Sequence, residues 1–309
     1  MTTSFHSIWT ALPVVLAVVA GGCAPSEPLT TREVAKGFLT QMFTDGDMRG
    51  AYEHYAAPDF IQHNPTMADG VKAHEAHFEE QAKDPHGDPK AWRHVTNMVL
   101  VDGDLFALHH EAFNGPGDPG RVFVDIWRVA NGKIVEHWDV IQTIPTTMLH
   151  NNGMGCGADS YESVGNGKGT IDQPACGLPD PKANREETLK VIKDYTEAVG
   201  KGDVHKAILD WFSPDYRQHS PNIADGAQGA IDYLDNEFGR GTEEMPKAGP
   251  SRVIAEGDYA MYHRLVTYAG ADRPSSNIDV FRVTNGKISE HWDVKQPVPD
   301  KSANTNGMW

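Results

Sequence analysis

The stretch Asn-Gly-Lys-Ile-Val-Glu-His-Trp-Asp-Val at residues 131–140 returns as Asn-Gly-Lys-Ile-Ser-Glu-His-Trp-Asp-Val at residues 285–294. Nine of the ten positions are identical. The Asn-Gly pair at the head of each copy predicts a tight hairpin turn, because such turns need positive φ. The β-branched and aromatic residues that follow predict a strand. So close a repeat indicates that one folding unit occurs twice in the chain.

Other short matches extend the repeat over most of the chain. The turn motif Gln-His-Asn-Pro at residues 62–65 returns as Gln-His-Ser-Pro at residues 218–221. The motif Asn-Gly-Met at residues 152–154 returns at residues 306–308. Single polar residues that recur in step are His109 with His263 and Asp125 with Asp279. The chain is therefore an internal duplication.

Length and charge agree with two ordinary domains. A chain of 309 residues can form two domains that each bury a core. Its 27 basic and 43 acidic side chains give a formal net charge of −16. Nucleic-acid binding needs clustered Lys and Arg, and the sequence has no such cluster. We therefore expect no nucleic-acid partner.

Each copy begins with helix signals and continues with strand signals. Thr30 and Asn184 are suited to cap helices, since a Glu follows three residues after each. A later helix is predicted over Val71–Gln81 and again over Ala227–Phe238. The strands predicted for the first copy are Val95–Val101, Leu105–Phe113, Val122–Val129 and Lys133–Gln142. Helices followed by an antiparallel sheet predict an α+β fold.

The N-terminal segment predicts export. Residues 8–22 are apolar or small and carry no charge, which is typical of a secretory signal and short for a membrane span. The run Val-Ala-Gly-Gly-Cys that ends at Cys23 resembles a bacterial lipobox, in which the cysteine is lipidated. We expect residues 1–23 to be a signal peptide and Cys23 to anchor the protein to the cell envelope, as its only membrane contact. An ordinary signal cleaved nearby is the alternative.

Two further cysteines fall in a Gly-rich stretch between the copies, residues 155–183, which we interpret as a linker. Export permits oxidation, and two cysteines in one loop suggest a disulfide between Cys156 and Cys176. Such a bridge closes a loop of about 20 residues and would contribute roughly 3 kcal/mol in the chain-entropy model. Two free thiols are the alternative.

Strand parity groups the polar residues of the repeated motif. Residues two apart on a strand share a face, so His137 and Asp139 point to one side, as do His291 and Asp293. Polar residues on the face that helices cover are unusual unless they line a cavity. The pattern therefore favours a polar site on one face of each sheet.

The motifs together resemble a known family. Asp-Ile-Trp-Arg at residues 125–128, Gly-Lys-Ile at 132–134 and Glu-His-Trp-Asp at 136–139 resemble SnoaL-like (polyketide cyclase-like) domains of the NTF2-like superfamily. The Gln-His-x-Pro and Asn-Gly-Met motifs are most similar to the subgroup predicted to catalyse aldol-type condensation. This resemblance covers residues 31–154 and residues 184–309, which we interpret as the two domains.

The resemblance implies a fold and a chemistry. Each domain is expected to be a cone, with three helices packed on a curved antiparallel sheet around a pocket. In such cyclases an acidic residue at the positions of Asp139 and Asp293 acts as acid or base. In ketosteroid isomerases the residue at the position of Asp125 helps to stabilise an oxyanion. Such domains usually pair through their sheets, so the two copies are expected to form an internal pseudo-dimer, with further homo-oligomers left open.

The expected site joins five polar residues in each copy. An aldol closure or isomerisation needs a base for an acidic C–H and a donor for the enolate oxygen, and requires no metal or organic cofactor. We expect Asp139 and Asp293 to be the bases and His137 or His63 to be the donor. The residues expected to converge are His63, His109, Asp125, His137 and Asp139 in one cavity, and His219, His263, Asp279, His291 and Asp293 in the other.

Other interpretations remain open. The same His and Asp side chains are suitable metal ligands, although no short metal-binding motif occurs in the sequence. His63 and His219 could instead fix the turn before Pro by bonding backbone groups. A module that binds a small molecule without catalysis is the main alternative to a cyclase, lyase or isomerase, because a fold does not determine a function.

Overall fold

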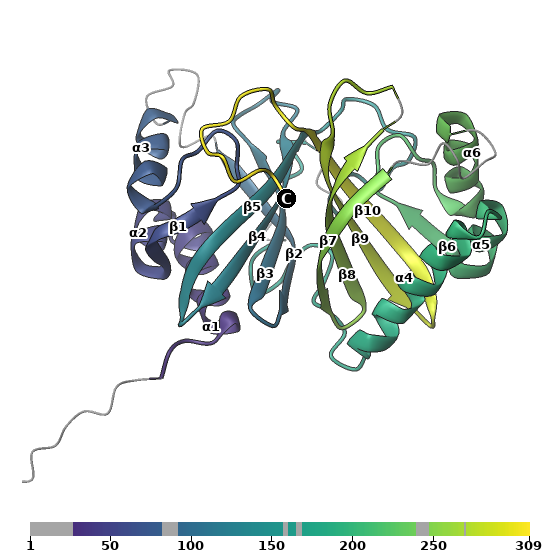
Figure 1. Ribbon diagram of the computed structural model, residues 1–309, viewed down its shortest axis with the longest axis horizontal. Coiled ribbons are helices and arrows are strands. Elements are labelled where there is room, and N and C mark those ends of the chain that lie inside the picture. The colour runs from purple at the N-terminus through teal and green to yellow at the C-terminus, as the bar shows by residue number, and fades with distance from the viewer. Residues whose placement is uncertain (1–26, 82–91, 157–159, 165–168, 239–246, 269) are drawn as a thin grey trace, which may run out of the picture.

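The computed structural model describes residues 27–81, 92–156, 160–164, 169–238, 247–268 and 270–309. Each half of the chain forms an α+β module with its helices first, which confirms the predicted fold class (Figure 1). The predicted signal peptide and Cys23 lie outside the described residues. Within the described ranges, no helix combines the length and the apolarity needed to cross a membrane.

The two modules contain the same elements in the same order. The first module consists of α1 (Thr31–Leu39), the short π-helix η1 (Thr40–Thr44), α2 (Met48–Tyr55), β1 (Ala56–Gln62), α3 (Val71–Gln81), β2 (Arg93–Asp102), β3 (Leu105–Phe113), β4 (Arg121–Ala130) and β5 (Lys133–Thr143). The second consists of α4 (Arg185–Gly200), α5 (Val204–Trp211), β6 (Phe212–Gln218), α6 (Gly226–Phe238), β7 (Lys247–Glu256), β8 (Tyr259–Thr267), β9 (Ser275–Thr284) and β10 (Lys287–Pro297).

The predicted local signals lie where the structure needs them. Asn131 and Asn285 have φ values of 52° and 53°, which confirms both Asn-Gly hairpins. The side chain of Thr30 accepts the backbone N–H of Glu33 and forms the predicted capping box. Asn184 caps α4 through its side chain in the same way. Short-range chemistry therefore fixes the starts of these elements.

Each sheet is mixed rather than wholly antiparallel. The strand orders are β1-β5-β4-β3-β2 and β6-β10-β9-β8-β7. The first strand, expected only as a short extended piece, pairs in parallel with the last and sets Gln62 beside His137 and Gln218 beside His291. This pairing is possible because helix α3 or α6 and three strands intervene, which gives the chain length that a parallel connection needs. The Gln-His-x-Pro turn is thereby brought to the repeated hairpin.

The modules pack sheet against sheet, with their helices on the outside (Figure 1). One face of each sheet packs on its own helices, around Phe38 and Trp127 in the first module and around Ile208 and Phe281 in the second. The opposite faces of both sheets share one central apolar core. The structure therefore confirms the expected internal pseudo-dimer. Trp138 and Trp292 are both buried in this shared core, as expected for packing residues.

The segments after β5 and β10 cross over to the other module. Nδ2 of Asn306 donates to the carbonyl of Gln62 at 2.9 Å and to Oδ1 of Asp69 at 2.8 Å. The reciprocal contacts join Asn152 to the Gln218 carbonyl at 3.0 Å and to Asp225 at 2.7 Å. The Asn-Gly-Met motif of each copy therefore docks on the Gln-His-x-Pro turn of the other copy, and this docking explains why both motifs recur.

The Gly-rich stretch between the modules packs against the first sheet. Cys156 and Cys176 form the predicted disulfide. The backbone of Ala175 donates to the carbonyl of Thr96, and the Thr96 N–H donates to the carbonyl of Gly169. These bonds satisfy backbone groups of β2, which lies at the edge of its sheet. The described part of the linker therefore covers a sheet edge.

Replacing Asn306 by Ala should lower the free energy of unfolding by about 1–2 kcal/mol, because two hydrogen bonds between modules are lost. Asn152→Ala is the matched variant in the other arm and should have a similar effect. Urea unfolding followed by circular dichroism measures both. Changes below about 0.3 kcal/mol in both variants would show that the crossed arms do not hold the modules together.

Candidate functional site

A carboxylate–imidazole–amide chain lies on the helix-covered face of the first sheet. Asp125 on β4 lies directly opposite Asp139 on β5, and His137 lies two residues before Asp139 on the same face. Nε2 of His137 is 3.0 Å from Oδ1 of Asp125. Nδ1 of His137 is 2.9 Å from Oε1 of Gln62, which reaches it from β1. These hydrogen bonds thus link the strands β1, β4 and β5.

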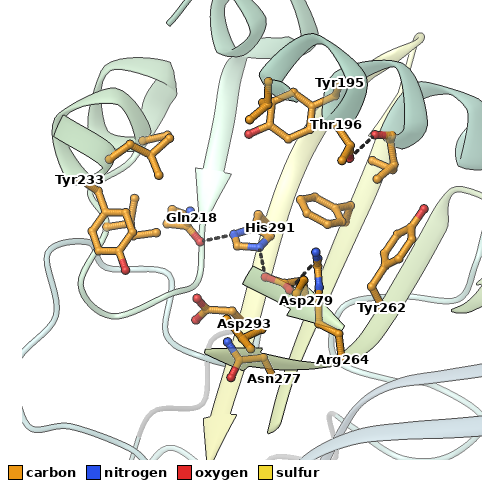
Figure 2. Close-up of a pocket in the computed structure, with 18 of the residues that line it drawn as sticks. Tyr195, Thr196, Gln218, Tyr233, Tyr262, Arg264, Asn277, Asp279, His291 and Asp293 are labelled. Atoms are coloured by element: carbon orange, nitrogen blue, oxygen red, sulfur yellow. Dashed lines mark hydrogen bonds and ion pairs between the residues drawn. The ribbon is translucent and has the colours of Figure 1, made fainter. Parts of the chain in front are cut away.

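The second module repeats this chain (Figure 2). Asp279 lies opposite Asp293. Nε2 of His291 is 3.2 Å from Oδ1 of Asp279, and Nδ1 is 3.1 Å from Oε1 of Gln218. The expected convergence of Asp, His and Asp on one side of each sheet therefore occurs in both modules. Their catalytic role stays a prediction.

The hydrogen bonds define where the protons of these imidazoles lie. Oε1 of Gln62 also accepts the backbone N–H of Asn64, so this oxygen faces Nδ1 of His137 and Nδ1 must donate. Burial raises the pKa of Asp125, but hydrogen bonds from His110 and His137 outweigh burial and hold it below its ordinary value. Both ring nitrogens of His137 are therefore engaged by side chains of the site.

The same reasoning applies to the second module. Oε1 of Gln218 accepts the backbone N–H of Ser220, so His291 donates to it through Nδ1. Burial raises the pKa of Asp279, but the adjacent Arg264 and the hydrogen bond from His291 outweigh burial. The pKa of Asp279 therefore lies below its ordinary value, and the carboxyl is ionised. Both ring nitrogens of His291 are therefore engaged as well.

The two modules differ in the groups around this shared chain. Oδ2 of Asp125 accepts from Nε2 of His110 at 2.8 Å. Oδ2 of Asp279 instead accepts from the guanidinium of Arg264 at 2.9 Å. Each partner lies at the corresponding position of the strand before, β3 or β8. A histidine in one module is thus replaced by a permanent cation in the other.

The second carboxyl of each pair also has a different partner. Asp139 accepts from Nδ2 of Asn64 at 2.5 Å, whereas Asp293 pairs with Nζ of Lys295 at 2.7 Å. Asp139 is 4% exposed, and its Oδ1 has no partner in the described part of the chain. Burial raises the pKa of Asp139 to about 6, and the nearby Asp125 adds to this effect. Asp139 therefore has a free, buried oxygen that can hold or release a proton.

A cavity of about 380 Å³ opens over the chain of the second module (Figure 2). Its walls are mainly apolar and aromatic and include Ile192, Phe212 and Phe281. The polar and ionisable side chains that line it are Tyr195, Thr196, Tyr216, Gln218, Tyr233, Tyr262, Arg264, Tyr268, Asn277, Asp279, His291, Asp293 and Lys295. A mainly apolar cavity with polar groups in its wall is suited to a small organic ligand.

His109 and His263 do not join these sites, contrary to expectation. His109 pairs in register with Val124, so it lies on the face opposite Asp125 and points to the other module. Burial lowers the pKa of His109 to about 3 and that of His263 to about 3. The sequence shows which residues of one strand share a face, but it does not show how neighbouring strands align. A shift of one residue in this alignment moves each side chain to the opposite face of the sheet.

His63 and His219 also lie away from the expected cavities. Nδ1 of His63 donates to the carbonyl of Gly307 at 2.7 Å, Nε2 is 2.9 Å from Glu136, and the ring stacks on Trp138. His219 makes the corresponding contacts with Gly153, Glu290 and Trp292. These two residues fasten the crossed arms, which agrees with the alternative interpretation of the turn.

Several residues of the site were not predicted from the sequence. They are Gln62, Asn64, His110, Gln218, Arg264, Asn277 and Lys295. The recurrence of Gln62 and Gln218 in the turn motif was a usable signal. No such signal pointed to His110 and Arg264, because the two copies of the repeat differ at this position. Only the register between strands places His110 beside Asp125 and Arg264 beside Asp279.

Among the described residues, Asp125, His137 and Asp139 form a group that could hold a metal ion, with one ligand atom from each within 4.8 Å of the others. Both oxygens of Asp125 and both ring nitrogens of His137 already have hydrogen-bond partners. A metal ion would have to displace these protons. The donor set therefore fits acid–base chemistry better than it fits metal binding.

Comparison with known proteins gives matches in both modules. The SnoaL-like domain family matches residues 35–137 and residues 192–291. A crystal structure described as a SnoaL-like polyketide cyclase from Mesorhizobium loti is 23% identical, covers 35% of this chain and 97% of its own, and has a TM-score of 0.26. An NTF2-like protein from Burkholderia xenovorans LB400 is 16% identical, with coverages of 37% and 92% and a TM-score of 0.30. No curated protein matches the chain significantly.

Replacing Asp139 by Asn should flatten the pH dependence of stability between about pH 4 and pH 6. The raised pKa of about 6 means that the folded chain keeps a proton which the unfolded chain, with an ordinary value of 3.8, has released. The stability from this group is present below about pH 4 and is lost as pH rises through 6, by up to roughly 3 kcal/mol. Urea unfolding at several pH values should find Asp139→Asn at least as stable as the parent at pH 7.

Asp125→Asn is the matched control for that measurement. The pKa of Asp125 is lowered, so its stabilisation is present above the ordinary value and is lost as pH falls. Its removal leaves His110 and His137 without their anion and should cost about 3–5 kcal/mol at pH 7. If Asp139→Asn is destabilised as strongly as Asp125→Asn, Asp139 is a structural partner.

Proposed function

Because this chain belongs to the SnoaL-like domain family, with one domain in each half, we propose that it is an exported enzyme that moves a proton on a small, largely apolar carbonyl compound. The reaction class is an aldol-type cyclisation or an isomerisation, and it uses no cofactor. Export and the lipid anchor at Cys23 belong to the proposal and rest on the N-terminal sequence.

The observation that carries the proposal is the position of Asp293. Its carboxylate lies in the wall of a mainly apolar cavity, beside the fixed Asp279–His291 pair. A carboxylate held against an apolar ligand can accept a proton from a C–H next to a carbonyl group. Positioned acid–base groups of this kind typically contribute about 10²–10⁴-fold to a rate.

The negative charge that develops on the carbonyl oxygen also needs stabilisation. Lys295 and Arg264 line the same cavity as cations. Burial raises the pKa of Tyr195, so its phenol stays neutral and can donate a hydrogen bond. Fixed donors in a site with little water stabilise an enolate much better than they would in bulk water. The cavity therefore supplies a base for the C–H proton and hydrogen-bond donors for the carbonyl oxygen.

Asp139 is the corresponding candidate in the first module. It has an oxygen without a partner and a pKa raised to about 6. A catalytic acid or base is most effective when its pKa lies near the working pH. His137 and His291 are positioning residues in this proposal, because hydrogen bonds occupy both of their ring nitrogens. The imidazole fixes the neighbouring carboxylate and leaves the second Asp to contact the substrate.

Ligand binding without catalysis is the second candidate function. SnoaL-like and NTF2-like domains generally bind small molecules. The observation that favours this function is the ion pair between Asp293 and Lys295, because a neighbouring cation makes a carboxylate a weaker base.

Proton transfer can be tested without knowledge of the full reaction. The mature chain is incubated with 2-tetralone in D₂O, and loss of the α C–H signal is followed by NMR. Asp293→Asn should lower the catalysed exchange by about 10²-fold or more, because the base is removed. The same measurement on Asp139→Asn assigns the contribution of the first module.

Asp300→Asn serves as the control, because it removes one acidic group from the surface, where Asp300 pairs with Arg273. It should leave the exchange rate unchanged. Exchange no faster than with buffer, in a chain that still binds 2-tetralone by calorimetry, would reject catalysis in favour of simple binding.

A further inference from the structure

The two sites carry different charges although they derive from one repeated unit. In the second module two cationic side chains, Arg264 and Lys295, lie beside two carboxylates, Asp279 and Asp293. Both cations also line the cavity. A cation beside an apolar cavity is stabilised by an anionic partner.

Each of these charge states follows from its contacts. Burial lowers the pKa of Lys295, but the adjacent Asp293 outweighs burial and raises it above its ordinary value. Arg264 is permanently charged. Burial raises the pKa of the lining phenols Tyr195, Tyr216 and Tyr268, so they add no negative charge.

The first module is the internal comparison. His110 occupies the position of Arg264, and Ile141 occupies the position of Lys295. Nδ1 of His110 has no partner in the described residues, and Nε2 bonds Asp125. The first site therefore has neither of the two cationic side chains that lie beside the carboxylates of the second. These two substitutions make the second site the more positively charged of the two.

Two buried polar atoms at the cavity of the second module also have no partner within the described ranges. One of them is Oδ1 of Asn277, a residue that is only 4% exposed. Its Nδ2 donates to the hydroxyl of Tyr268 at 2.7 Å, which fixes the orientation of the amide. Nε of Arg264 is likewise buried without a partner in the described residues. The cavity therefore offers one free acceptor and one free cationic donor.

We propose that the cavity of the second module binds a small aromatic or polycyclic organic anion that also carries a hydroxyl group. The anionic oxygen contacts Arg264 and Lys295, the hydroxyl donates to Asn277, and the rings pack on Phe281 and Tyr262. This inference deepens the proposed function, and it rests on that function in taking the cavity as the substrate site. The corresponding site of the first module, which lacks both cations, is expected to select against such an anion.

Isothermal titration calorimetry of the full mature chain tests the inference with three probes at pH 7. The probe with both features is 6-hydroxy-2-naphthoate. Its neutral relative, 6-hydroxy-2-naphthamide, lacks the charge, and 2-naphthoate lacks the hydroxyl. The hydroxy acid should bind at least tenfold more tightly than the amide and severalfold more tightly than 2-naphthoate. An amide that binds as tightly as the acid would overturn the proposal.

Two substitutions should change the affinity in opposite directions. Lys295→Ile copies the first module and should weaken binding of the hydroxy acid about tenfold, while the surface control Lys301→Ile should not. Asp293→Asn removes a negative charge and should tighten binding severalfold. Unchanged or weaker binding by Asp293→Asn would overturn the proposal even if Lys295→Ile failed to fold.

The same variant separates this inference from the proposed function. Asp293→Asn should lose deuterium exchange on 2-tetralone and at the same time gain affinity for the hydroxy acid. Tighter binding in a chain whose parent shows no exchange would support the anion site and reject catalysis. Exchange by the parent, without preference for the acid over the amide, would support catalysis and reject the anion site.

Discussion

The buried hydrogen bond between an Asp and a His, Asp125 with His137 and Asp279 with His291, is the constraint on which the rest of each module depends. Polar side chains in a protein interior are tolerated only when their remaining hydrogen-bonding capacity is satisfied. Gln62 and Gln218 satisfy the second ring nitrogen, and they reach it only because the first strand pairs in parallel with the last. The mixed sheet is therefore a requirement of the site as well as of the fold.

The two copies of the duplicated fold carry different side chains at their sites. The strands, hairpins and Gln–His–Asp chains are common to both modules, whereas His110 and Ile141 are replaced by Arg264 and Lys295. These two exchanges alter the charge of the site without altering the backbone that holds it. The sheets share one core, and the C-terminal arm of each module packs on the other module. Disruption of the sheet that carries one site would therefore also affect the other site.

The recurring histidines divide into two groups with separate roles. His137 and His291 belong to the buried chains of the sites. His63 and His219 clamp the crossed arms through a backbone carbonyl and a glutamate, and each stacks on a Trp of the shared core. Recurrence in both copies therefore identifies residues that the pseudo-dimer needs as well as residues that a ligand would contact. Only the direction in which a side chain points separates the two.

The sequence by itself determined the duplication, the α+β order of elements, the Asn-Gly hairpins and the placing of Asp125, His137 and Asp139 on one face, because periodicity, capping and turn chemistry are local properties. It also identified the pair of cysteines that form the disulfide. Only the tertiary structure decided the strand register, which turns His109 away from the site and brings His110 into it. The partners Gln62, Arg264 and Lys295 were decided in the same way, because contacts between strands depend on a register that no single strand encodes.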